Sequence, residues 1–123
     1  TAAYGVRVPQ VDADGNDLGG IRSVHQQVPI GTYTGWNLGR ADRFEDGFCS
    51  LQGSFIPFAQ TRAEREAAGD PRLSLEERYP TKEAYVAAVR KAADQLVGKR
   101  LLLKPDAEAL VAEAERGGVR AAP

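Results

Sequence analysis

The central segment of this chain is residues 21–40, IRSVHQQVPIGTYTGWNLGR, which contains its only histidine, His25, and its only tryptophan, Trp36. The apolar residues of this segment recur too irregularly for one helix face. Pro29 and the glycines interrupt a helix or weaken a strand. We therefore expect an extended, buried crossing without a regular element, whose apolar groups pack on a core that other residues supply.

The composition indicates one domain with a thin core. The chain has 123 residues, and its hydrophobic share of 42 % includes many alanines and no methionine. Its net charge of -1 gives no field to hold a polyanion, so we expect no nucleic-acid partner. No apolar run approaches the roughly 20 residues of a spanning helix, and residues 1–10 lack the features of a signal peptide. We therefore expect a soluble protein that binds no membrane.

The segment before residue 21 has the pattern of a β-hairpin. Residues 4–11 alternate apolar and polar side chains around a proline, which predicts a short edge strand. The turn residues that follow, 12–16, predict a return through Leu18 and Ile21.

The same acidic turn also invites comparison with a calcium-binding loop. Counted from Asp12, such a loop needs glycine at its sixth position and glutamate at its twelfth, where this chain has Asp17 and Ser23. A plain solvated turn is the better interpretation.

The densest apolar run is residues 48–58, which Gly53 and Pro57 make too broken for a helix. We expect one buried strand or an extended apolar arm. Cys49 lies in this run, but no base near it in the sequence would lower the pKa of its thiol. A buried, inert cysteine is the better interpretation, and a single cysteine excludes an internal disulfide or a zinc cluster.

Helices are predicted after residue 58. Thr61 with Glu64, and Ser74 with Glu77, have the spacing of capping boxes. The expected helices are 62–68, which Gly69 ends, one or two turns after Ser74, residues 82–97 with Thr81 and Gly98 as caps, and about 105–116. Each of the two long helices has one narrow apolar stripe, so they resemble the outer layer of a larger body.

These patterns divide the chain into three parts. Residues 1–60 form an extended segment with a β-hairpin and an apolar arm, which packs on a larger core. Residues 61–116 are a helical segment, and residues 117–123 are a flexible tail.

No complete catalytic set can be found in these residues. The chain has no Gly-x-Ser-x-Gly sequence, no phosphate-binding glycine loop and no metal-spaced histidines, so we predict no cofactor and no metal site. His25 is a weak candidate for a general base, although Gln26 and Gln27 beside it favour a structural role. Thr1 could act as an amino-terminal nucleophile, but too few strands follow for the two-sheet sandwich of such hydrolases.

The order of motifs is more informative than any single residue. The chain contains in succession VPQVDADGNDLGGIR (8–22), VPIGTYTGWN (28–37), GSFIPF (53–58), TRAERE (61–66), EERYPTKEAYVAAVR (76–90) and LLLKPDAEALVAEAE (101–115). This order resembles the carboxy-terminal section of the bacterial alpha/beta hydrolase domain-containing proteins, over nearly the whole chain.

The resemblance implies an α/β fold class, as the carboxy-terminal part of an alpha/beta-hydrolase-like fold, here a β-poor extended half followed by three or four helices. It also implies a serine hydrolase of esters or related acyl compounds, whose catalytic set lies upstream of the matching section. This chain would then be structural rather than catalytic, with the larger amino-terminal remainder of the hydrolase as partner and a small ester as that partner's substrate. Either the bacterial cytoplasm or export fits.

An alternative of another class is a small non-catalytic interaction module, whose apolar arm docks on an unrelated protein. If instead Trp36, Phe48, Phe55 and Phe58 belong to a core shared with upstream residues, we expect the isolated chain to fold only in part or to self-associate.

Overall fold

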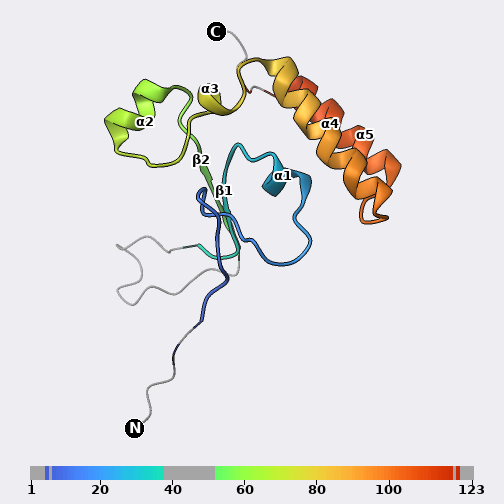
Figure 1. Ribbon diagram of the computed structural model, residues 1–123, viewed down its shortest axis with the longest axis horizontal. Helices are drawn as coiled ribbons and strands as arrows, with labels where there is room; N and C mark the ends of the chain where they lie inside the picture. The colour runs from blue at the N-terminus through green and yellow to red at the C-terminus, as the bar shows by residue number, and fades with distance from the viewer. Residues whose placement is uncertain (1–4, 6, 38–51, 118, 120–123) are drawn as a thin grey trace.

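The computed structural model describes residues 5, 7–37, 52–117 and 119 (Figure 1). Its elements in chain order are α1 (Val24–Gln27), β1 (Gly31–Thr34), β2 (Ser54–Pro57), α2 (Arg62–Ala68), α3 (Leu75–Arg78), α4 (Lys82–Gly98) and α5 (Lys104–Arg116). The small sheet lies between α2 and α3 on one side and the paired helices α4 and α5 on the other (Figure 1).

The central segment contains two regular elements, so the expectation of an irregular crossing is wrong. The Ser23 side chain accepts from the Gln26 N–H, and the Gln26 side chain accepts from the Ser23 N–H. This capping box starts α1 although the helix has only one turn. Val24 and Val28 are buried, but Trp36 is 51 % exposed, so only part of the segment inserts into a core.

The two strands pair antiparallel in the register Gly31↔Pro57, Thr32↔Ile56, Tyr33↔Phe55 and Thr34↔Ser54. Gly31 is required here, because a Cβ at this position would lie 2.4 Å from the Phe55 ring. The strand predicted in the apolar run is therefore present, but Phe55 and Ile56 are nearly half exposed and only Phe58 is buried. The prediction of one buried strand is wrong, because Ser54 is half-buried and the other three residues of β2 are exposed. Phe48, Cys49 and Leu51 lie outside the described residues.

The predicted amino-terminal hairpin is reduced to its turn. Within the described residues, one bridge joins Val11 to Asp17, and the Leu18 N–H donates to the Gln10 carbonyl at 2.9 Å. The described residues among 4–11 lie exposed before that bridge and form no strand, which corrects the expected edge strand. In the described part of the chain, no neighbouring strand supplies the partner that an edge strand needs.

The helix starts predicted from capping boxes are confirmed. Thr61 with Glu64, and Ser74 with Glu77, form reciprocal boxes, and Thr81 caps α4. Gly69 ends α2 in the left-handed region. None of the helices within the described ranges has both the length and the apolar composition needed to cross a bilayer.

The end of α4 differs by one residue from the prediction. The helix includes Gly98, and the left-handed residue beyond it is Arg100, with φ 60°. The Arg100 N–H donates to the Val97 carbonyl and the Leu101 N–H to the Leu96 carbonyl, both at 2.9 Å. This is a Schellman motif with arginine in the position where glycine is usual.

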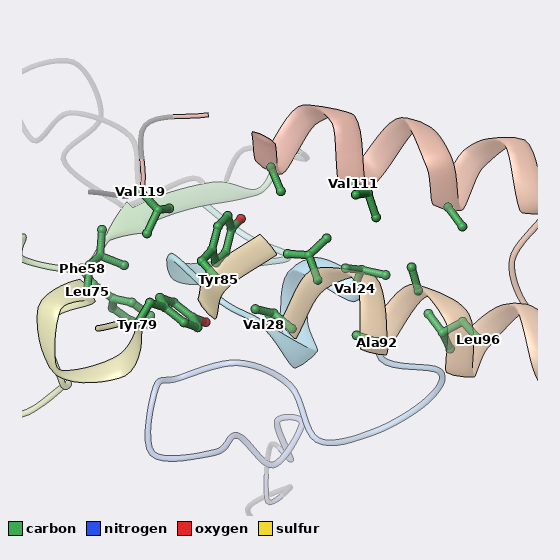
Figure 2. Close-up of a cluster of buried hydrophobic side chains, with 14 residues drawn as sticks. Val24, Val28, Phe58, Leu75, Tyr79, Tyr85, Ala92, Leu96, Val111 and Val119 are labelled. Atoms are coloured by element: carbon green, nitrogen blue, oxygen red, sulfur yellow. The ribbon is translucent and has the colours of Figure 1, made fainter. Parts of the chain in front are cut away.

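The core lies where α1, α3 and the end of β2 meet α4 and α5 (Figure 2). After a short loop α5 runs back along α4 (Figure 1). Both helices contribute buried alanines to the core. The buried apolar residues are Val24, Val28, Phe58, Leu75, Tyr79, Tyr85, Val89, Ala92, Ala93, Leu96, Ala107, Val111, Ala114 and Val119. The apolar stripes of α4 and α5 therefore pack against each other and against α1 within this chain. They do not serve solely to cover a larger body.

Candidate functional site

A polar cluster forms around the acidic turn. One Asp12 carboxylate oxygen accepts from the N–H groups of Asp14 and Asn16, at 2.9 and 3.0 Å. The other accepts from Arg22 at 2.5 Å. Burial alone would raise the pKa of Asp12, but the hydrogen bonds from Asn16 and Arg22 outweigh it and lower that pKa.

Asn16 connects this turn to the sheet. Its side chain is fully buried, with 0 % exposure, and its Nδ2 donates to the Gly31 carbonyl at 3.2 Å. Its Oδ1 accepts from the Tyr33 N–H at 2.8 Å. The carboxamide thus makes the two bonds to the outer edge of β1 that a peptide group of a third strand would make.

Two arginines connect the turn to α3. Arg78 pairs with the Asp14 carboxylate through both of its terminal nitrogens. The Thr32 hydroxyl donates to the Asp14 carbonyl and accepts from Arg72 Nη1 at 2.9 Å. Segments more than sixty residues apart in the sequence are therefore held together by charged hydrogen bonds.

Phe58 joins this polar cluster to the apolar core. The guanidinium carbons of Arg78 and Arg72 lie over its ring, at 4.2 and 5.2 Å from the centroid. The Phe58 side chain is buried, so these cation–π contacts are partly shielded from water. Tyr79, which follows α3, is bonded to the residues before β1, because its hydroxyl donates to the Pro29 carbonyl at 2.8 Å.

The carboxylates of this region are used as structural ion pairs. The hydrogen bond from Arg72 lowers the pKa of Asp70 to about 2. Arg65, which donates two bonds to Glu77 at 2.7 and 2.9 Å, lowers the pKa of that carboxylate as well. Asp12 and Asp14 each hold an arginine, and the described residues contain no group of three metal-binding side chains.

A second feature is an apolar cavity of about 480 Å³ between α1, the sheet and the end of α5. Val24 and Val28 form one wall, and Tyr85 and Val89 of α4 form another. Figure 2 shows Val24, Val28, Phe58, Leu75, Tyr85 and Val119 converging on this region from separate elements. A volume of this size lies within the range of small-molecule sites, roughly 300 to 1,000 Å³.

Few polar groups line this cavity. The Tyr33 ring lies between His25 and Phe55, with centroid distances of 6.0 and 5.0 Å. Burial raises the pKa of Tyr33, and the nearby Tyr85 and Glu113 raise it further. Burial also raises the pKa of Tyr85, again with a contribution from Glu113.

A larger depression, of about 870 Å³, runs along the outer face of α4. Charged side chains such as Lys82, Arg90 and Asp94 line much of it. Because charged and polar side chains make up most of its lining, whereas apolar side chains dominate the smaller cavity, the smaller cavity is the better binding candidate.

The residues that the sequence suggested as catalytic candidates are placed differently by the structure. His25 is an exposed residue of α1 at the cavity, and no carboxylate or serine hydroxyl of the described residues bonds to its ring. Its catalytic role stays an untested prediction. Cys49 and Thr1 lie outside the described residues. Sequence reasoning missed the roles of Asn16 and Arg78, because local sequence shows neither the burial of Asn16 nor the distant partner of Arg78.

The comparisons with known proteins bear on the origin of this arrangement. A family model described as Alpha/beta hydrolase domain matches residues 1–112. The chain belongs to the alpha/beta hydrolase domain family. Searches of curated proteins and of solved structures find no match. Membership in this family agrees with the α/β class and indicates a hydrolase-type protein.

Several motifs of this alpha/beta hydrolase chain meet in the polar cluster. The turn of residues 12–16 supplies Asn16, the GTYT segment supplies β1, and the EERY segment supplies Arg78. Their side chains bond to one another and to backbone. The cluster therefore holds β1, β2 and α3 together.

Proposed function

We propose that this chain is the carboxy-terminal part of a serine hydrolase that acts on esters or related acyl compounds, and that it is structural rather than catalytic. The observation that carries the proposal is the family match over residues 1–112, in a sequence without a Gly-x-Ser-x-Gly elbow. The nucleophile then belongs to residues other than these.

The polar side chains support the structural role. Asp12, Asp14, Asp70 and Glu77 are all paired with arginines, which leaves none of them free to orient a histidine. A serine hydrolase needs an acid, a histidine and a serine in mutual contact. Among the described residues, no serine hydroxyl and no carboxylate bonds to the ring of His25 on α1.

The exposed apolar side chains support the proposal that the partner of this chain is the remainder of the same hydrolase. Trp36, Phe55 and Ile56 are each about half exposed, beside a sheet that has only two strands in the described part. Large apolar side chains gathered at a surface mark contacts with other protein. The larger partner would cover β2 and bind the ester.

The test compares the chain with the whole protein that contains it. The whole protein should hydrolyse short p-nitrophenyl esters, and residues 1–123 alone should not. In the whole protein, His25→Ala should lower turnover by less than about tenfold, because loss of a general base costs on the order of a hundredfold or more. A larger fall with an unchanged near-ultraviolet circular dichroism spectrum would make His25 catalytic and overturn the structural role.

A second function, a small non-catalytic interaction module, is favoured by the core that this chain closes between α1, α4 and α5. The intact mass of the native material separates the two. A companion sequence with Gly-x-Ser-x-Gly supports the hydrolase, and native material of only these residues supports the module.

A further inference from the structure

The cavity between α1, the sheet and α5 contains a buried hydroxyl without a partner. Tyr85 is 8 % exposed, yet its hydroxyl has no hydrogen-bond partner among the residues that the structure describes. In that same part of the chain, the one fully enclosed side-chain nitrogen or oxygen without a partner is Arg22 Nε. The Tyr85 hydroxyl is therefore not sealed in protein but reaches open space.

The open space that it reaches is the apolar cavity, which Tyr85 lines. In Figure 2 the Tyr85 oxygen points away from Tyr79 and toward the carboxy-terminal end of α5. Tyr79 in contrast bonds to a backbone carbonyl. A hydroxyl that no protein group bonds and that opens onto a cavity can donate to, or accept from, a polar group of a bound ligand.

The charged side chains that line the cavity indicate which charge a ligand should carry. Glu113 is the one carboxylate among the described lining residues, and neither lysine nor arginine lines the space. No ion pair joins Glu113 to another described residue. Glu113 lines the cavity together with Tyr33 and Tyr85, and its charge contributes to the raised pKa of both tyrosines.

The remaining walls favour the same ligand. Tyr33, Phe55 and Tyr85 contribute aromatic rings, whereas the ring of Phe58 is already contacted by Arg72 and Arg78. Aliphatic side chains such as Val89 and Leu110 line the rest. Aromatic faces attract organic cations, and the attraction is stronger when water is excluded. Glu113 is exposed, and its carboxylate can accept a hydrogen bond from a charged donor bound in the cavity that it lines.

We propose that this cavity binds a compact apolar molecule that carries a positively charged amine. Its hydrocarbon part lies against Val24, Val89 and Leu110, and its ammonium donates to Glu113 and to the hydroxyls of Tyr33 and Tyr85. This binding goes beyond hydrolysis and does not depend on it, because a protein without esterase activity would still bind such an amine.

Calorimetric titration of the whole protein with three probes of one shape tests the proposal. The probes are 4-phenylbutylammonium, the neutral 4-phenylbutan-1-ol and the anionic 5-phenylpentanoate. We expect the ammonium to bind about tenfold or more tightly than the alcohol, and the anion to bind most weakly. Equal binding of the amine and the alcohol, or binding of none of the three, would overturn the proposal.

Variants identify the site. Glu113→Gln should weaken ammonium binding roughly threefold to tenfold and leave the alcohol unchanged, and Tyr85→Phe should weaken it about threefold. Glu108→Gln makes the same charge change at an exposed α5 position outside this cavity and should have no effect. Both test changes are close in shape to the native side chain, and near-ultraviolet circular dichroism verifies folding. Unchanged ammonium affinity in both Glu113→Gln and Tyr85→Phe would place the amine elsewhere and overturn the proposal.

Discussion

The backbone N–H of Tyr33 donates to the side-chain Oδ1 of Asn16 at 2.8 Å, at the outer edge of β1. The Asn16 amide nitrogen donates in return to the Gly31 carbonyl, two residues earlier. A side chain therefore satisfies the edge that would otherwise pair with another strand. The two-stranded sheet is closed on this side and open along β2, where Phe55 and Ile56 are exposed.

Replacement of Asn16 tests this closure. Asn16→Ala removes both bonds and leaves two buried backbone groups unpaired, so we expect a loss of about 2 kcal/mol in the free energy of unfolding. Asn16→Asp loses the donor and buries a charge, with an expected loss of about 3 kcal/mol. Urea denaturation measures both. Gln95→Ala, at an exposed α4 position, should stay within about 0.5 kcal/mol of wild type, and a similar result for Asn16→Ala would contradict the closure.

A second prediction concerns the close approach of the strands at Gly31. A Cβ there would lie 2.4 Å from the Phe55 ring and 2.6 Å from the Ile56 carbonyl oxygen. Gly31→Ala should therefore destabilise the protein by about 1 to 3 kcal/mol. Gly35→Ala is the matched control, because a Cβ at that position meets nothing within 4 Å. Thermal melts of the two variants that coincide would show that the register of β1 and β2 differs from this one.

A third prediction concerns the Schellman motif after α4. Arg100 adopts φ 60°, and a left-handed conformation of a residue with a Cβ is unfavourable by roughly 1 to 2 kcal/mol. Arg100→Gly should therefore stabilise the protein by about 1 kcal/mol. Lys99→Gly, one residue earlier at φ -82°, should give no gain. A lower melting temperature for Arg100→Gly would argue that the arginine side chain contributes a contact that offsets its strain.

A fourth prediction follows from the lowered carboxylate pKa values. Arg72 lowers the pKa of Asp70 from 3.8 to about 2, and those of Asp12 and Glu77 are lowered in the same direction. Because each folded-state pKa lies below its unfolded value, this stabilisation is complete above about pH 5 and is lost as pH falls toward 2. Melting temperature measured from pH 6 to pH 2 should be level and then fall. Asp70→Asn should make the fall shallower, and an unchanged slope would show that the Asp70 pair contributes nothing.

Local signals explain which parts of this fold were predictable. The boxes of Thr61 with Glu64 and of Ser74 with Glu77 lie within four residues of the helix start, so the sequence alone predicts them. The start of α1 uses Gln26 in the same role, but its single turn carries too short a hydrophobic pattern to be recognised.

The polar cluster and the cavity could not be predicted in the same way. Asp14 and Arg78 lie 64 residues apart, and no local pattern pairs them. Tyr85 has the right spacing for the buried face of α4, and it is buried there. That its hydroxyl lacks a partner depends on α5 and β1, which only the three-dimensional arrangement brings together.

The central claim is that these residues are the structural part of a serine hydrolase whose nucleophile lies elsewhere. The most direct measurement is to label the whole protein with a fluorophosphonate probe and to locate the modified residue by peptide mass spectrometry. The account predicts stoichiometric labelling of one serine outside residues 1–123, and no labelling of this chain by itself. Stoichiometric labelling of any serine within these residues would contradict it.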